Sequence, residues 1–118
     1  MTVTIYHNPG CGTSRNVLQY LRDQGTQPVV IEYLKMPPDR ATLESLLLRM
    51  NMKASALVRR KGDLYASLGL DRPGVTDKQF FDAMLENPVL IERPIVVTPD
   101  AVKLCRPWET VKEIVPGH

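Results

Sequence analysis

The chain has 118 residues, of which 43% are hydrophobic and 24% are charged, ordinary proportions for one globular domain. Fifteen Lys and Arg residues against 13 Asp and Glu residues leave a formal net charge of +2, too small to attract nucleic acid or a membrane surface by bulk charge. No apolar run approaches a membrane span, and no signal-peptide pattern is present. We therefore expect a single domain over residues 1–118, no nucleic-acid or membrane partner, and a cytoplasmic location.

A short strand and a loop are predicted first. Val3 and Ile5 alternate along a short segment, which is the pattern of a half-buried strand. Residues 7–12 then contain Asn-Pro and two glycines, and these residue types favour a loop. The helix that follows is expected to be capped by Thr13 or Ser14, because both side chains can accept a hydrogen bond from a backbone N–H group.

The next segments predict a helix and a second strand. Apolar residues recur at helical spacing between Val17 and Leu21, and Gln24-Gly25 is expected to end the helix. The β-branched run 29–31 then predicts a strand. Because a strand–helix–strand connection favours parallel pairing, we expect the two strands to run parallel in one sheet.

The middle of the chain is predicted to be helical. Asp39 is expected to cap one helix, and residues 54–60 are expected to form a shorter one. Thr76 and Gln79 have the spacing of a capping box at the start of a further helix. We interpret this region as a helical insertion.

The last third predicts a β-hairpin and a closing helix. Residues 95–97 and 102–104 are expected to be strands, joined by a turn at Thr98-Pro99-Asp100. Pro107 suits the first turn of the helix after them. The order of elements predicts an α/β protein with a thioredoxin-like fold, in which a mixed four-stranded sheet carries a helical insertion.

Cys11 is the candidate nucleophile. It lies in a glycine-flanked loop just before a predicted helix, where unpaired backbone N–H groups stabilise an anion or a thiolate. A thiol pKa lowered by roughly two units from about 8.5 makes the thiolate the major form near pH 7. The alternative is a small buried apolar residue. Ser14 stands where the redox motif of this fold usually has a second cysteine, so a resolving thiol must come from elsewhere.

Two other residues have open alternatives. Cys105 is either a resolving thiol or a buried structural residue, and its place at the end of a predicted strand favours the second interpretation. His7 either tunes the Cys11 thiol or only makes a hydrogen bond within the loop, and the sequence favours neither.

Three arginines are candidates for binding an anion. Arg59, Arg93 and Arg106 come from separate segments, and guanidinium groups bind tetrahedral oxyanions through paired hydrogen bonds. The alternative for each one alone is a solvated surface arginine. Pro94 begins a predicted strand, at the place where thioredoxin-like folds have a cis proline, so we predict a cis Arg93–Pro94 bond.

Four stretches of the sequence occur together and in order over nearly the whole chain: 5–9, 11–16, 92–99 and 104–107. With these stretches the sequence resembles the glutaredoxin-dependent arsenate reductases. The resemblance implies that Cys11 is the nucleophile that forms a covalent thiol–arsenate adduct and that His7 helps to keep it ionised. It also implies three anion-stabilising arginines and a supporting loop: Arg59, Arg93 and Arg106, then Gly12, Thr13, Ser14 and Arg15.

The resemblance further implies the partners of the reaction. Glutathione, a co-substrate rather than a bound cofactor, attacks the adduct; glutaredoxin then reduces the resulting mixed disulfide, and arsenite is released. No metal ion is expected. Two alternatives stay open: a redox-sensing regulator that binds RNA polymerase, and a monothiol glutathione-linked oxidoreductase with another substrate. Ser14 argues against the first, because such regulators use paired cysteines, and the three arginines argue against the second.

Overall fold

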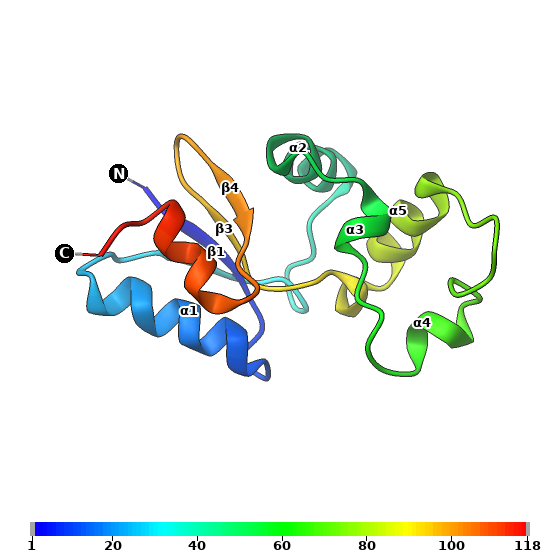
Figure 1. Cartoon of the computed structure of the whole chain (residues 1–118), viewed down its shortest axis with the longest axis horizontal. Helices are drawn as coiled ribbons and strands as arrows, with labels where there is room; N and C mark the ends of the chain where they lie inside the picture. Colours follow the sequence, from blue (N-terminus) through cyan, green and yellow to red (C-terminus); the bar gives the residue numbers. More distant parts are fainter. Residues whose placement is uncertain (1, 118) are drawn as a thin grey trace. The chain divides into compact units, whose positions relative to one another are not determined.

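The computed structural model describes residues 2–117. The chain divides into two compact units (Figure 1). The first unit combines the chain up to Met36 with the chain from Arg93 onward, and the second runs from Pro37 to Glu92. The second unit is the predicted helical insertion. The expectation of a single domain over residues 1–118 stays a prediction.

The first unit is built on a four-stranded sheet with the order β2-β1-β3-β4. Its strands are β1 (Thr4–His7), β2 (Val29–Glu32), β3 (Ile95–Val97) and β4 (Val102–Leu104). β1 and β2 run parallel with His7 opposite Glu32, whereas β3 is antiparallel to both β1 and β4. The predicted mixed sheet, with its parallel pair and its hairpin, is therefore confirmed.

Two helices pack together on one face of this sheet (Figure 1): α1 (Gly12–Asp23) and the 3-10 helix η2 (Trp108–Glu113). Burying a large aliphatic side chain contributes about 2 kcal/mol, so the apolar residues between these elements hold α1 and η2 against the sheet. The core of the unit consists of Val3, Ile5, Val17, Leu18, Tyr20, Leu21, Val96, Cys105, Val111 and Val115.

Two helix starts differ from the prediction. Helix α1 begins at Gly12 with Cys11 as its N-cap, so the predicted caps Thr13 and Ser14 are wrong. Ser14 lies in the first turn, where its hydroxyl bonds to residues before the helix instead of capping it. Pro107 is the N-cap of η2 rather than part of its first turn, and the closing element is a 3-10 helix.

All the named elements of the second unit are helices, and short connections join them. These are α2 (Arg40–Met50), α3 (Ala54–Leu57), α4 (Leu64–Ser67), α5 (Asp77–Glu86) and the 3-10 helix η1 (Pro88–Leu90). The predicted caps are confirmed: Asp39 accepts a hydrogen bond from the N–H of Thr42 at 2.8 Å, and Thr76 and Gln79 form the reciprocal capping box.

The helix predicted over residues 54–60 ends early, at Leu57. Val58 is extended and forms an isolated antiparallel bridge with Ile91, a residue far away in the sequence. A buried β-branched side chain fits such a pairing better than a further helical turn. Arg59 therefore lies on a strand-like segment instead of a helix.

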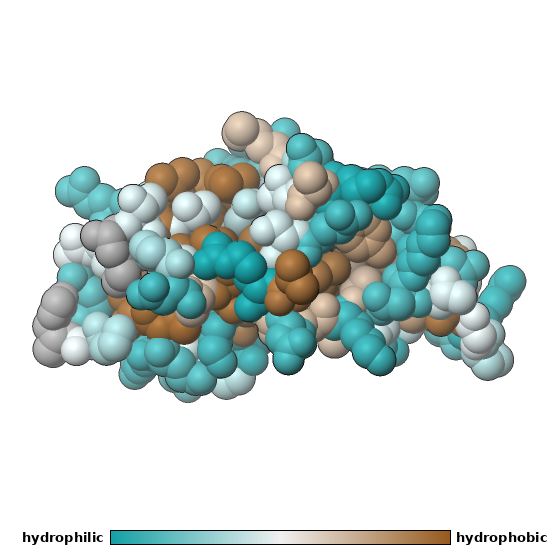
Figure 2. Space-filling view, turned by 90° about the horizontal axis from the view of Figure 1, so that it is seen from above, coloured by the Kyte–Doolittle hydropathy of each residue, from teal (hydrophilic) through white to brown (hydrophobic). Residues whose placement is uncertain are grey.

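Some apolar side chains reach the surface, and brown groups of them are visible between hydrophilic ones in Figure 2. The large exposed ones are Val29, Val30, Leu34, Met36, Leu48, Leu68 and Val89. Within residues 2–117, no helix combines the length and the apolar character that crossing a bilayer requires.

Candidate active site

A tight turn leads from β1 to the cysteine. The N–H of Cys11 donates to the carbonyl of Asn8 at 3.0 Å, and the side-chain oxygen of Asn8 accepts the N–H of Gly10 at 2.9 Å. Asn8 is buried. Asn8 thus shapes the loop from within, a role that the sequence analysis missed although an Asn before a proline and a glycine is a recognised turn signal.

A buried hydrogen-bonded pair joins the end of β1 to the first turn of α1. The Nδ1 atom of His7 lies 2.6 Å from the hydroxyl oxygen of Ser14, and the N–H of Asn8 donates to the same oxygen at 3.1 Å. Ser14 is fully buried and His7 nearly so. The imidazole thus forms a hydrogen bond with Ser14, and the idea that His7 helps to keep Cys11 ionised stays a prediction.

The pKa of the Cys11 thiol lies below its ordinary value because several donors outweigh a desolvation cost. Partial burial of the sulfur favours the neutral thiol, but the backbone N–H groups of Ser14 and Thr13 and the guanidinium groups of Arg106 and Arg93 favour the thiolate. The sulfur lies at the N-terminus of α1, where the helix dipole adds to this effect. It is half-buried, so a small anion can still reach it.

Two of the three predicted arginines lie at this cysteine. One Nη atom of Arg106 donates to the backbone carbonyl of Arg93 at 3.0 Å and lies 3.7 Å from the sulfur of Cys11, within hydrogen-bonding range for sulfur. Arg93 is buried at 7% exposure, and its charge acts on the thiol. The peptide bonds Arg93–Pro94 and Arg106–Pro107 are both cis; the first was predicted and the second was not.

The remaining loop residues surround the same helix start. Gly12 is the first residue of α1, and Thr13 follows it. Arg15 is exposed and donates to the carbonyl of Pro9 at 2.9 Å, so it braces the turn before the cysteine. The predicted supporting loop is thus contiguous around Cys11, and its part in the chemistry stays a prediction.

Arg59 belongs to the second compact unit. Its guanidinium donates to a carboxylate oxygen of Glu92 at 2.8 Å. The structure therefore brings Cys11, Arg93 and Arg106 together in the first unit, whereas a place for Arg59 beside them stays a prediction. Glu92 was not predicted as a site residue, although it directly precedes Arg93 in the sequence.

Cys105 lies in the apolar core of the first unit with no exposed surface. Burial raises the pKa of its thiol to about 12, with a small lowering contribution from Lys103. A thiol that stays neutral is a poor nucleophile. The structure thus favours the structural interpretation of Cys105 over the interpretation as a resolving thiol.

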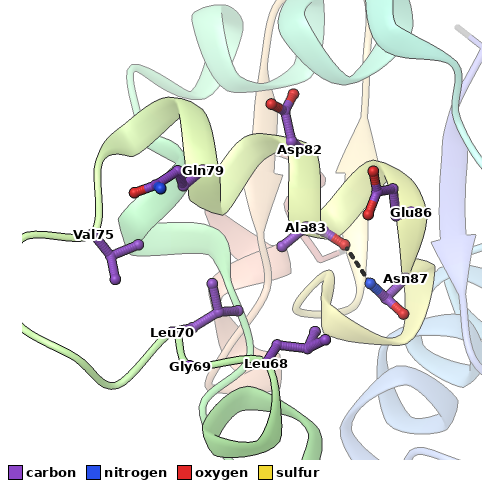
Figure 3. A pocket seen from close by; sticks show the side chains of 9 residues that line it. All are labelled: Leu68, Gly69, Leu70, Val75, Gln79, Asp82, Ala83, Glu86 and Asn87. Carbon is purple, nitrogen blue, oxygen red and sulfur yellow. Dashed lines mark hydrogen bonds between the residues drawn. The ribbon is translucent and has the colours of Figure 1, made fainter.

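A separate pocket of about 290 Å³ lies within the second unit, between α5 and the segment after α4 (Figure 3). Two carboxylates and no cationic side chain line it, so it is poorly suited to an oxyanion. Its lining residues are Leu68, Gly69, Leu70, Val75, Gln79, Asp82, Ala83, Glu86 and Asn87. Among residues 2–117, no group of three His, Cys, Asp or Glu side chains is arranged to hold a metal ion.

Replacing His7 by glutamine is expected to flatten the pH dependence of stability below about pH 6.5. Burial lowers the pKa of His7, Glu32 opposes this shift, and Arg22 and Arg15 add to it. The unfolded chain therefore binds more protons than the folded one between the two pKa values, and the free energy of unfolding falls as the pH drops through this range. Urea unfolding of both proteins between pH 5 and 8 measures the difference. Equal slopes would contradict a neutral buried imidazole.

Replacing Cys105 by alanine is expected to leave the fast-reacting thiol in place and to lower the free energy of unfolding by roughly 1 kcal/mol. Only the half-buried Cys11 should react quickly with a thiol reagent in the folded protein, since Cys105 is sealed in the core. Reagent uptake before and after denaturation counts the two classes of thiol. Loss of the fast phase in this variant would assign the reactive thiol to Cys105.

Comparison with known proteins extends these observations. The chain is 52% identical to an arsenate reductase of Rhizobium meliloti over 116 residues, which is 98% of this chain and 83% of that protein. It is 50% identical to an arsenate reductase of Escherichia coli K12 over 114 residues, 97% of this chain and 81% of that protein. The solved structure of an arsenate reductase from Vibrio cholerae superimposes with a TM-score of 0.90 at 43% identity, covering 97% of this chain and 98% of that one.

These similarities extend over the strands, the cysteine loop and the helical insertion alike, and the fold is thioredoxin-like, as predicted. The sequence model of the ArsC family matches residues 6–114, which include the cysteine loop and all three candidate arginines. The chain belongs to the ArsC family.

Proposed function

We propose that this protein is an arsenate reductase in which the thiolate of Cys11 attacks arsenate and glutathione and glutaredoxin supply the electrons. The observation that carries the proposal is the sulfur at the N-terminus of α1, half-buried and in contact with the Arg106 guanidinium. Membership of the ArsC family and the similarity to arsenate reductases at about 50% identity support the reduction of arsenate.

Arsenate binding is proposed to use the charges that already act on the thiol. Arg106 and Arg93 offer guanidinium N–H groups, and the backbone N–H groups of Thr13 and Ser14 point toward the sulfur. These donors match the oxygens of a tetrahedral dianion. Arg59 is proposed as the third arginine, in keeping with the family resemblance. Together the cations offset the repulsion between a thiolate and an approaching anion.

In the first chemical step the Cys11 sulfur forms a bond to arsenic. An As–O bond breaks, and the oxygen leaves as water once it has been protonated. Arsenic remains at oxidation state V in this adduct. Donors that are fixed before the reaction stabilise the charge that builds up on the arsenate oxygens, and they need no reorganisation as it forms.

In the second step the thiolate of glutathione attacks the Cys11 sulfur. An S–S bond forms, the S–As bond breaks, and its electron pair stays on arsenic, which is released as arsenite at oxidation state III. Glutaredoxin then reduces the mixed disulfide by thiol–disulfide exchange. External thiols are required because Ser14 replaces a local resolving cysteine and Cys105 is sealed in the core.

The proposed setting is a reducing cytoplasm, where glutathione is available and the free thiol of Cys11 persists. Neither a metal ion nor a bound cofactor takes part in the proposed steps, since the two thiols carry both electrons. Nucleic acid and membrane are not among the proposed partners.

The test is arsenate-dependent oxidation of NADPH in the presence of glutathione, glutaredoxin and glutathione reductase. Each component is left out in turn, and phosphate replaces arsenate as the non-reducible oxyanion. The proposal expects activity only in the complete mixture. Activity with thioredoxin in place of glutathione and glutaredoxin would overturn the proposed electron donors, and inactivity with every thiol donor would overturn the reductase itself.

A further inference from the structure

A groove of about 290 Å³ lies within the first unit, between α1 and the start of η2, which pack side by side (Figure 1). Its volume is at the lower end of the range for ligand pockets, so it suits a small molecule better than a segment of a folded protein. Five residues line this α1–Trp108 groove: Asn16, Gln19, Tyr20, Asp23 and Trp108.

The α1–Trp108 groove lies on a face of α1 that begins next to the active cysteine. Gly12, Asn16 and Gln19 are spaced by four and three residues, so they share one face of the helix. Gly12 directly follows Cys11. A Cβ atom at Gly12 would have room in the described part of the chain, with only an ordinary contact to Nη2 of Arg15 at 3.7 Å. The face is therefore open between the sulfur and the groove.

The distance along the helix matches one arm of a tripeptide thiol. At a rise of 1.5 Å per residue, Asn16 lies roughly 8 Å and Gln19 roughly 12 Å beyond Cys11, and helical side chains lean back toward the N-terminus. When the thiol of glutathione meets the Cys11 sulfur, an extended arm of the tripeptide covers roughly 10 Å. That arm reaches both carboxamides, whereas Asp23, roughly 18 Å beyond Cys11, is out of its reach.

The polar wall of the α1–Trp108 groove matches peptide groups. Asn16 and Gln19 are exposed, and each carboxamide has an acceptor oxygen and two N–H donors. The Nε2 atom of Gln19 donates to a carboxylate oxygen of Asp23 at 2.7 Å. This bond orients the Gln19 amide and leaves its oxygen to accept an N–H of a bound peptide. The two carboxamides thus fit the two amide bonds of glutathione.

The opposite wall is aromatic and already fixed. The ring of Trp108 lies 6.0 Å from the ring of Tyr20, whose hydroxyl donates to the carbonyl of Val115 at 2.7 Å. The ammonium of Lys112 lies 5.1 Å from the centre of the Trp108 ring. Because glutathione has two carboxylates and one ammonium near pH 7, this cation complements its net negative charge. A wall that is fixed before binding loses little conformational freedom when the ligand arrives.

Both walls start from residues at the sulfur. Helix α1 follows Cys11 directly, and Trp108 is two residues after Arg106, which contacts the sulfur. We propose that the α1–Trp108 groove binds the peptide part of glutathione and presents its thiolate to the Cys11 sulfur in the second step. This inference rests on the proposed function and adds a site for the co-substrate, distinct from the arginines proposed to bind arsenate.

Formation of the mixed disulfide in a single turnover tests the inference without glutaredoxin. The parent protein, an Asn16→Ala/Gln19→Ala double variant and Trp108→Ala are mixed with arsenate and increasing glutathione, and mass spectrometry of the intact protein follows the gain of one glutathionyl group. We expect the glutathione concentration at half-maximal rate to rise about tenfold in both variants, while the maximal rate stays within about twofold. A thiol without peptide groups, 2-mercaptoethanol, should react equally with all three proteins.

Matched controls separate binding in the groove from a general loss of structure. Gln27→Ala removes an exposed carboxamide outside the groove and should behave like the parent. Trp108→Phe keeps an aromatic wall and is expected to remain within about threefold of the parent. If Trp108→Ala does not fold, the double variant decides, because both of its substitutions are at exposed positions. The pH profile of Cys11 alkylation should be unchanged in the double variant.

The outcomes distinguish this inference from the proposed function. Equal losses with glutathione and with 2-mercaptoethanol would show damage at Cys11 itself and would overturn the inference, as would parent-like dependence on glutathione in the double variant. A mixed disulfide that forms normally but is reduced more slowly by glutaredoxin would assign the groove to glutaredoxin instead. The proposed function fails separately, if the parent forms no mixed disulfide with either thiol in the presence of arsenate.

Discussion

Serine in place of Cys11 is expected to abolish arsenate reduction, with a loss of roughly 10³-fold or more in kcat. The donors around the sulfur lower the pKa of Cys11 and so favour its thiolate, whereas a serine hydroxyl is a much weaker acid and a weaker nucleophile. Serine also cannot form the mixed disulfide with glutathione, and in the proposed second step arsenite is released as that disulfide forms. The arsenate-dependent NADPH assay measures the loss, and thermal unfolding checks that the variant is folded.

The matched control for this substitution is Cys105→Ala, which removes the other thiol of the chain. This variant should retain the activity of the parent, since Cys105 lies in the apolar core. Activity that survives Cys11→Ser would reject Cys11 as the nucleophile. Loss of activity in both single variants, with folding intact, would point to a reaction that needs an internal pair of thiols.

Arg106→Ala is expected to weaken the site in two measurable ways. It removes a charge-assisted contact to the Cys11 sulfur, so the pKa of the thiol should rise and its reaction with a thiol reagent should shift to higher pH. It also removes a guanidinium from the proposed oxyanion site. We expect kcat/KM for arsenate to fall by roughly 10²-fold. The pH profile of alkylation and the kinetics with arsenate measure the two effects separately.

Two control variants test whether the effects of Arg106→Ala come from its position and from its planar guanidinium group. Arg72→Ala removes an exposed arginine of the second unit and should change neither measurement. Arg106→Lys keeps the positive charge but offers a single ammonium in place of a planar fork, so it should restore the alkylation profile more fully than it restores kcat/KM. If Arg106→Ala behaved like the parent in both measurements, the proposed anion site would be wrong even if Cys11 is the nucleophile.

Elements that depend on nearby residues could be predicted from short sequence patterns. The alternation of Val3 and Ile5 and the β-branched run 95–97 predicted strands that the structure contains. The capping box of Thr76 and Gln79 was also predicted correctly. Each of these patterns depends only on residues within a few positions of one another. The local sequence is therefore enough to predict the backbone conformation at that place. The spaced motifs that carry the resemblance likewise predicted the family.

Contacts between side chains that are far apart in the sequence could not be predicted before the chain was seen folded. The sequence around residues 54–60 does not predict that Val58 pairs with Ile91 and ends the helix. The sequence around Ser14 does not predict that its hydroxyl forms a hydrogen bond with His7. The contact between Arg106 and the Cys11 sulfur joins residues that are 95 positions apart. Such contacts form when the sheet and its helices bury their apolar faces together, so they depend on the packing of the whole unit and not on the propensity of any one segment.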